Sequence, residues 1–260
     1  MKIASWNVNS IRSRLNHVID WLDNSRVDVL CLQETKVVDQ DFPQPPFLDL
    51  GYHLAVSGQK AYNGVAIISR SPLTQVQAGF QPLLGEQAGD LDSQKRLLAG
   101  VIEGVQLVNL YVPNGSTIGS DKYTYKLHWL RTLRDYLRQL VEEQPATIIC
   151  GDFNIALENS DIHDPELAET HIMASPLERG ALQSILDVGF KDVFRKFTSE
   201  GGHYSWWDYR EGAFRRNRGW RIDHIYATSL PYDTTIGCTI DLEPRRWTKP
   251  SDHTPVVMEL

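Results

Sequence analysis

A short apolar run ends in a carboxylate and a carboxamide in the segment Thr147-Ile148-Ile149-Cys150-Gly151-Asp152-Phe153-Asn154. Apolar and β-branched residues without polar alternation are typical of a buried strand. Asp152 and Asn154 stand just beyond that run, at the rim where α/β folds usually place their sites. The segment therefore predicts an α/β fold with polar chemistry at the ends of its strands.

The same arrangement recurs elsewhere in the chain. A single carboxylate after a strand is most often a turn former or a helix cap, but repetition at one strand end after another indicates a shared site. Oxygen ligands without cysteine favour Mg²⁺ or Mn²⁺ over zinc, and a carboxylate-bound Mg²⁺ beside a His-Asp pair suits hydrolysis of a phosphate ester. The other strand ends carry Asn7 and Asn9 after Trp6, Glu34 after Gln33, Asp223-His224 after Ile222, and Ser251-Asp252-His253 before the last apolar run.

Short β-rich runs alternate with a few helices along the rest of the chain. Apolar residues at helical spacing predict helices over residues 11–22, 120–143 and 177–186. Many strands with few strict strand–helix–strand units predict two packed sheets with helices outside, an α/β sandwich. The strands are expected at residues 2–6, 27–32, 52–56, 63–69, 96–103, 105–112, 147–150, 203–207, 221–227, 235–240 and 255–260.

The bulk composition fits an ordinary globular protein, with 42% hydrophobic and 23% charged residues among 260. No segment approaches the roughly 20 consecutive apolar residues that a membrane span needs, and the N-terminus lacks the features of a signal peptide. We therefore expect a cytoplasmic protein without a membrane partner. The three cysteines are far apart and form no Cys-x-x-Cys pair, which argues against a zinc ribbon or a disulfide framework.

The formal net charge of −7 argues against a protein that coats nucleic acid by bulk attraction. It is compatible with an enzyme that concentrates basic residues on one face. A divalent metal would offset part of the repulsion between an acidic site and a phosphate.

The ordered motifs resemble those of the exonuclease III family of apurinic/apyrimidinic (AP) endonucleases, within the endonuclease/exonuclease/phosphatase, DNase I-like superfamily. They cover essentially the whole chain, so one catalytic domain over residues 1–260 is expected, as a monomer without built-in targeting. The resemblance implies a four-layer αββα sandwich of two packed mixed β-sheets flanked by helices. The motifs are Ser5-Trp6-Asn7-Val8-Asn9, Leu32-Gln33-Glu34-Thr35-Lys36, Tyr111-Val112-Pro113-Asn114, Gly151-Asp152-Phe153-Asn154, Arg221-Ile222-Asp223-His224 and Ser251-Asp252-His253.

The resemblance also implies a metal site. Glu34 would be the principal ligand, supported by Asn7 and, depending on the position of the ion, by Asp252. Mg²⁺ keeps several waters and uses few protein carboxylates, so one dominant glutamate is chemically sensible. We expect Mg²⁺ as the cofactor, with Mn²⁺ as a substitute.

Catalytic roles follow from the same resemblance. Asp152 would orient and deprotonate the attacking water, and Asn154 would hold the phosphate or that water. His253 would contact a phosphate oxygen while Asp223 fixes its tautomer and favours its charged form. Tyr111 would hydrogen-bond the phosphate or support the leaving oxygen.

A second assignment of the acid and the base stays open. In it the Asp223–His253 pair is the base and Asp152 is the acid, since both arrangements put an acid and a base within reach of the phosphate. Further polar residues read equally well as phosphate contacts or as turns and caps: Asn9, Lys36, Asn63 and Asn114.

The segment 204–223 distinguishes between substrates, because the superfamily also includes lipid phosphatases, sphingomyelinases and unspecific nucleases. It resembles the DNA-repair branch, in which apolar side chains enclose an extruded abasic sugar, here Trp206, Trp220 and Ile222. Basic residues interleave with these aromatics, as expected of a nucleic-acid groove. These basic residues are Arg210, Arg215, Arg216, Arg218 and Arg221, followed by Arg245, Arg246 and Lys249; Lys122 and Lys126 would add to the groove or form a solvated helix face.

The expected function is that of a DNA repair nuclease acting on double-stranded DNA with abasic sites, nicks or 3′ ends. It would combine AP endonuclease, 3′–5′ exonuclease and 3′-phosphatase or phosphodiesterase activity. One alternative is a 3′-end-processing member without AP endonuclease activity, because the loop over residues 157–179 offers Met173 as a bulky neighbour of the scissile site. The other is a sibling phosphoesterase with a substrate other than DNA.

Overall fold

The computed structural model describes residues 1–260 apart from the side chain of Leu167, and its strands form two six-stranded sheets. The first sheet has the order β11-β12-β1-β2-β4-β3 and the second the order β5-β6-β7-β8-β10-β9. The first contains β1 (Lys2–Asn7), β2 (Val29–Gln33), β3 (His53–Ser57), β4 (Val65–Ser69), β11 (Gly237–Ile240) and β12 (Val256–Glu259). The second contains β5 (Thr74–Ala78), β6 (Leu97–Ile102), β7 (Val105–Tyr111), β8 (Thr147–Asp152), β9 (Lys191–Asp192) and β10 (Asp223–Ala227).

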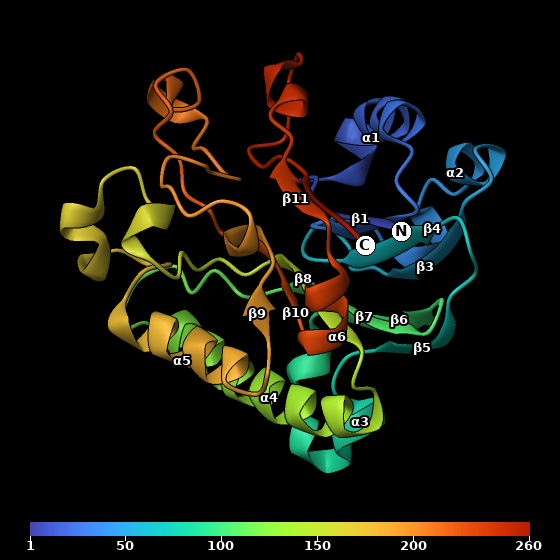
Figure 1. Cartoon of the computed structure of the whole chain (residues 1–260), viewed down its shortest axis with the longest axis horizontal. Helices are drawn as coiled ribbons and strands as arrows, with labels where there is room; N and C mark the ends of the chain where they lie inside the picture. Colours follow the sequence, from blue (N-terminus) through green and yellow to red (C-terminus); the bar gives the residue numbers. More distant parts are fainter.

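Helices cover the outer faces of both sheets. In Figure 1, α1 (Ile11–Ser25) and α2 (Pro45–Asp49) lie beyond the first sheet, while α4 (Asp121–Glu143) and α5 (Pro176–Leu186) lie beyond the second. The predicted four-layer αββα sandwich is therefore confirmed, as are the helices expected at residues 11–22, 120–143 and 177–186. The short helices α3 (Gln81–Leu84) and α6 (Ser229–Thr234) complete the set.

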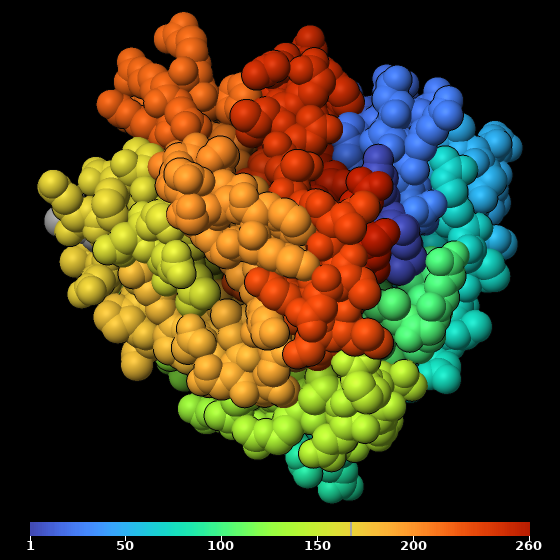
Figure 2. Space-filling model, in the orientation of Figure 1, coloured from blue at the N-terminus to red at the C-terminus, as the bar shows by residue number. Residues whose placement is uncertain are grey.

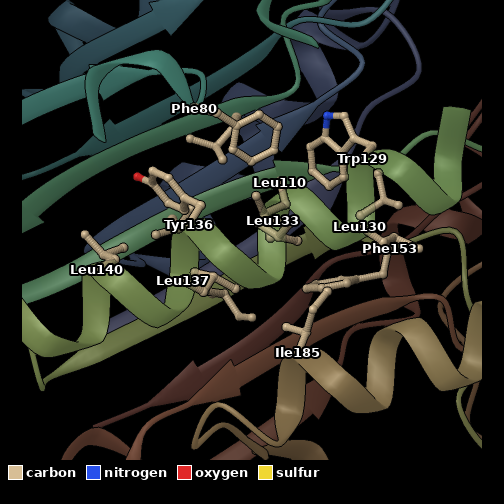
Figure 3. Close-up of a cluster of buried hydrophobic side chains, with 14 of the residues drawn as sticks. Phe80, Leu110, Trp129, Leu130, Leu133, Tyr136, Leu137, Leu140, Phe153 and Ile185 are labelled. Atoms are coloured by element: carbon tan, nitrogen blue, oxygen red, sulfur yellow. The ribbon is translucent and has the colours of Figure 1, made fainter. Parts of the chain in front are cut away.

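Three apolar clusters hold the layers together. Ile3, Ile67 and Ile148 belong to the cluster between the two sheets, and Trp6 with Trp21 belongs to the cluster under α1. Figure 3 shows the third, in which α4 packs its apolar face on the second sheet and on Phe153 and Ile185. The central strands are covered on both faces, which explains why their sequences do not alternate between apolar and polar residues.

Each sheet contains one parallel strand pair, β1 with β2 and β7 with β8. Helices α1 and α4 connect the two members of each pair. Gly151 is required where β8 approaches β7, because a Cβ added there would lie 1.9 Å from the carbonyl oxygen of Leu110. The φ of Gly151 is also +147°, which favours glycine. The glycine thus lets Asp152 end its strand beside Tyr111, its partner in the register.

One predicted strand is absent among the described residues, and strands β5 and β9 were not predicted. Residues 203–207 form no strand; Trp206 makes only isolated bridges, to Trp220 and to His253. Strand β5 was not expected, because all five of its residues are exposed and the segment carries no buried pattern. The strands expected to begin at residues 221 and 235 begin instead at Asp223 and Gly237. None of the described helices is long and apolar enough to cross a membrane.

Candidate active site

Polar side chains from both sheets meet at one edge of the sandwich. Asn7 and Gln33 end the parallel strands β1 and β2 in register, and Tyr111 and Asp152 end β7 and β8 in register. Asp223, the first residue of β10, pairs with Asp152 in the antiparallel direction. The registers of the two sheets thus gather these groups without help from long loops.

Glu34 follows β2 and is held by two neighbours. Its Oε1 accepts a hydrogen bond from Nδ2 of Asn7 at 2.9 Å, and its Oε2 lies 2.8 Å from Nζ of Lys36. Burial alone would raise the pKa of Glu34, but Lys36 and Asn7 outweigh burial and hold the pKa below its usual range. The carboxylate is therefore ionised at neutral pH and ready to bind a cation.

Asp152 is buried at the centre of the cluster. It accepts hydrogen bonds from Nδ2 of Asn7 at 2.9 Å and from the backbone N–H of Asn154 at 2.8 Å. Burial raises its pKa to about 7; His253 opposes this shift and the nearby Asp223 carboxylate adds to it. A carboxylate with this pKa can take up and release a proton near neutral pH.

His253 lies between two carboxylates. Its Nδ1 is 2.8 Å from Oδ2 of Asp223, and its Nε2 is 3.7 Å from Oδ2 of Asp152. Burial lowers the pKa of the imidazole, but Asp223 and Asp152 outweigh burial and raise the pKa to about 10. The ring is therefore an imidazolium at neutral pH, with its Nδ1–H donated to Asp223.

One group of side chains is suited to a metal ion. Ligand atoms of Glu34, Asp152 and His253 all lie within 4.8 Å of one another. Because the imidazolium of His253 has no free lone pair, the two carboxylates are the groups that would bind a cation. The buried carboxylate of Asp152 and the partly exposed carboxylate of Glu34 supply hard oxygen donors that fit a divalent cation such as Mg²⁺, which would also lower the cost of keeping both ionised. Asp252 lies outside this group: its oxygens accept from Nδ2 of Asn9 at 3.0 Å and from Nε1 of Trp206 at 3.1 Å.

Asn114 and Asn154 form a chain of hydrogen bonds that ends at Asp152. Nδ2 of Asn114 donates to Oδ1 of Asn154 at 3.0 Å, and Nδ2 of Asn154 donates to the carbonyl of Val112 at 3.0 Å. Tyr111 lies on the same side, with the guanidinium of Arg96 4.7 Å from its ring centre. Burial and the charges of Glu34 and Asp152 raise the pKa of Tyr111 well above its usual value, so its hydroxyl stays protonated as a donor.

A cavity of about 610 Å³ opens near this cluster. Trp206 and Trp220, which pair through an isolated bridge, contribute to its wall together with Arg218 and Met173. Ile222 does not line the cavity; it is buried and packs in the same apolar cluster as Trp220 and Met173. Figure 2 shows the two segments that form the wall, the yellow one around residues 160–172 and the orange one around residues 205–218, on the same side of the molecule.

The family is shown by comparison with known proteins. A sequence model of the endonuclease/exonuclease/phosphatase family matches residues 4–253. The chain belongs to this family. It is similar to exodeoxyribonuclease III of Haemophilus influenzae, with 32% identity over 100% of this chain and 99% of that protein.

Two solved structures of family members share the fold closely. A 3′-5′ exonuclease, NExo, from Neisseria meningitidis has a TM-score of 0.95 and 39% identity, covering 100% of this chain and 99% of that chain. An AP endonuclease from Archaeoglobus fulgidus has a TM-score of 0.94 and 42% identity, covering 100% and 99%. The resemblance to the exonuclease III branch of the endonuclease/exonuclease/phosphatase family is thereby confirmed.

Several basic residues expected in a DNA groove of this family member have other roles. Arg221 is buried in ion pairs with Asp161 and Asp192, and the side chain of Lys126 is 0% exposed. Arg245 is buried too, with its guanidinium 4.9 Å from the ring centre of Phe214. By contrast Arg210, Arg215, Arg216 and Arg218 are exposed.

Two residues of the cavity were not predicted from the sequence, and one residue of a strand-end motif lies elsewhere. His171 and Ile172 line the cavity, and the His171 ring lies edge-on to Trp220 at 6.1 Å. No local signal marks them, because they stand in an irregular segment. His224 lies away from the site: its Nε2 is 2.8 Å from the carbonyl of Ile155, and burial lowers its pKa to about 4.

Proposed function

We propose that this chain is a Mg²⁺-dependent DNA repair nuclease of the exonuclease III type, which hydrolyses phosphodiesters at abasic sites and at the 3′ ends of duplex DNA. The observation that carries the proposal is the position of Asp152, a buried carboxylate with a pKa of about 7 next to the His253 imidazolium. The neighbouring aromatic cavity supports DNA as the substrate. The relatives named as an exonuclease and an AP endonuclease support the same reaction class.

Asp152 is the proposed general base. Its carboxylate would accept a proton from the attacking water. Nδ2 of Asn154 donates to Oδ2 of Asp152 at 3.3 Å and would hold that carboxylate in position. The opposite assignment, with His253 as the base, is disfavoured because a histidine with a pKa of about 10 is already protonated at neutral pH. We therefore favour Asp152 over the Asp223–His253 pair.

His253 and Tyr111 are the proposed donors to the phosphate. The imidazolium Nε2–H would donate to a non-bridging oxygen and stabilise the charge that grows there in the transition state. Asp223 holds Nδ1 and so keeps the ring charged and oriented. The protonated Tyr111 hydroxyl would donate to the phosphate or to the leaving oxygen, and Asn114 would hold Asn154 in place.

Glu34 would hold the metal, with Asn7 and Asp152 beside it and Asp252 farther out. Bound there, Mg²⁺ or its substitute Mn²⁺ would supply Lewis-acid stabilisation of the phosphate charge. Asn7 bridges the Glu34 and Asp152 carboxylates, so it would keep their separation fixed whether or not a cation is bound.

The cavity is the proposed site of an extruded abasic sugar. Trp206 and Trp220 provide apolar walls, and the exposed Arg218 at its edge would contact a DNA phosphate. A normal nucleotide would have to unstack from the duplex, and the cavity would have to hold its base as well as its sugar. An abasic sugar has no base to accommodate. Ile222 would support the wall from behind.

A second candidate is a 3′-end-processing enzyme without AP endonuclease activity. The observation in its favour is Met173, whose side chain lines the cavity next to Trp220. A bulky side chain there narrows the space for a sugar that continues into DNA on both sides. A monomeric state and a cytoplasmic location stay predictions.

The test uses two end-labelled duplexes, one with an internal abasic analogue and one with a nick that carries a 3′-phosphate. Each is incubated with the enzyme in Mg²⁺, in EDTA, and after Mg²⁺, Mn²⁺ or Zn²⁺ is returned. We expect incision of both duplexes, lost in EDTA and restored best by Mg²⁺. Removal of the 3′-phosphate alone would favour the second candidate, and cleavage of neither DNA would refute the proposal.

A further inference from the structure

A buried ion pair joins helices α4 and α5 beneath the candidate active site. Lys126 and Glu178 are both 0% exposed, with Nζ 2.5 Å from Oε1. The ammonium also donates to the backbone carbonyls of Asn114 at 3.1 Å and of Asn154 at 2.7 Å. An ammonium has three N–H donors, so all of them have a partner here.

Glu178 uses its remaining acceptor capacity on the segment before α5. Its Oε1 accepts from the backbone N–H of Met173 at 3.0 Å, and its Oε2 accepts from the backbone N–H of Ser175 at 3.1 Å. The Ser175 hydroxyl lies 2.6 Å from the same oxygen and 2.7 Å from the Tyr123 hydroxyl. The carboxylate therefore fixes the backbone on which Met173 stands.

The pair connects three segments that reach the site. Lys126 holds the turns after β7 and β8, whose side chains Asn114 and Asn154 lead to Asp152. Glu178 holds the segment that places Met173 in the cavity wall. The segments are close-packed, because a Cβ added to Gly115 would lie 3.1 Å from both Ile172 and Lys126.

Stability alone is a weak reason for such a pair, because well-packed apolar side chains often stabilise a protein as well as a buried ion pair does. We infer that Lys126 and Glu178 are positioning residues that fix the asparagines beside Asp152 relative to the Met173 wall of the cavity, and so help to set which DNA substrate reacts. The inference rests on the proposed function, since it concerns the same site. Neither residue can touch DNA, because both side chains are fully buried.

Substitution of Lys126 and substitution of Glu178 should affect the reaction in different ways. Lys126 contacts the asparagine turns, which serve any phosphodiester, so its loss should slow all substrates. Glu178 contacts the backbone of Met173 and Ser175, so its change should alter the ratio between internal abasic sites and 3′-phosphates. A purely structural pair would produce neither pattern in the folded protein.

The experiment measures kcat and KM on both duplexes for Lys126→Met, Glu178→Gln and Leu137→Ala, at a temperature where circular dichroism shows each variant folded. Leu137 is the matched control, because it is a fully buried residue of the same helix that lies 11 positions beyond Lys126, about 16 Å along the helix axis. A misplacement on the order of 1 Å can cost about 100-fold in rate. We therefore expect Lys126→Met to lower kcat about 10- to 100-fold on both DNAs with KM changed less.

For Glu178→Gln, incision at the abasic site should fall about 10-fold more than removal of the 3′-phosphate, because the wall segment loses one anchor. Leu137→Ala should change neither kcat nor the ratio. If Lys126→Met and Glu178→Gln had the same kcat and the same substrate ratio as Leu137→Ala, the inference would be overturned. If Lys126→Met does not fold, the double variant Lys126→Met/Glu178→Met leaves no lone buried charge and is judged by the same criteria.

The proposed function fails separately, if the unaltered enzyme cleaves neither DNA. If the unaltered enzyme is active and the Lys126 and Glu178 variants keep its kcat and its ratio between the two duplexes, only the positioning role is refuted. The proposed function is then unaffected.

Discussion

The carboxylate cluster lies at the ends of regular strands, whereas the neighbouring cavity is formed by segments with little regular structure. Asn7, Asp152 and Asp223 are placed by strand registers. The cavity wall has no such registers. Residues in the left-handed region occur in both places, with φ of +52° at Glu34 and +50° at Asn154 beside the cluster, and +74° at Met173 and +57° at Glu211 in the wall. Such positions are costly for residues other than glycine, so the surrounding contacts must hold them.

The wall gains its rigidity from buried ion pairs. Arg221, between the cavity residue Trp220 and Ile222, donates to Asp161 at 2.7 Å and to Asp192 at 2.7 Å. Arg195 pairs with Asp161 as well. The comparison teaches that hydrogen-bonded sheets fix the chemistry, while selection of the substrate depends on a wall that charged side chains hold in place.

The largest effect is expected at the strand ends. Asp152→Asn removes the proposed base while keeping the size of the side chain, so the single-turnover rate should fall about 10²- to 10⁴-fold. DNA binding, followed by fluorescence anisotropy, should stay close to that of the unaltered protein. Near-normal turnover in this variant would remove Asp152 from the mechanism.

A change in the wall's ion pairs should act on stability rather than on chemistry. Asp161→Asn leaves Arg221 buried with one carboxylate fewer, which should lower the free energy of unfolding by about 3–5 kcal/mol. Urea denaturation at pH 7 measures it. A loss below about 1 kcal/mol, the range of an exposed pair, would show that the pair does not hold the wall.

The same aspartate makes a pH prediction. Burial raises the pKa of Asp161, but Arg221 outweighs burial and holds the pKa below the usual range of an aspartate. Because the folded-state pKa is depressed, the stabilisation is present above that range and is lost as the pH falls through the folded-state pKa. Between pH 5 and 3 (roughly the window of this transition), the unaltered protein should lose more stability than Asp161→Asn; parallel curves would contradict this account.

A smaller effect is expected inside the cavity. Met173→Gly removes the bulky side chain and suits the positive φ, while the backbone bonds to Glu178 and Ala156 can persist. Incision at an internal abasic site should rise about 10-fold, the scale of discrimination by one apolar group, with little change in 3′-phosphate removal. Single-turnover rates on the two duplexes measure this ratio, and an equal change on both would show that Met173 does not select between them.

The sequence predicted the strand ends well because their signal is local. Apolar runs that stop at Glu34 or Asp152 carry both the strand and the polar residue within a few positions. The registers then bring these ends together, as the sandwich architecture requires. Ion pairs between residues far apart in the chain could not be predicted from the sequence. Arg221 was predicted to bind DNA, but in the structure it pairs with Asp161, 60 positions away.

The remaining misses have the same cause. Lys126 was expected on a solvated or DNA-facing side of its helix, but Glu178, 52 positions away, lies beside it in the interior. The segment 203–207 looks like a strand because it is aromatic, yet Trp206 forms only isolated bridges. Contacts with distant parts of the chain, which no local pattern encodes, decided both.

The central claim is that strand ends perform the reaction and the aromatic wall selects the substrate. The most direct measurement is the ratio of single-turnover rates on the internal abasic duplex and the 3′-phosphate duplex, for Asp152→Asn and Trp220→Ala side by side. The account predicts that Asp152→Asn lowers both rates and leaves the ratio unchanged, while Trp220→Ala lowers the abasic rate about 10-fold more than the other, as loss of an aromatic contact implies. Equal losses on both substrates for Trp220→Ala, or a changed ratio for Asp152→Asn, would contradict the division between the two regions.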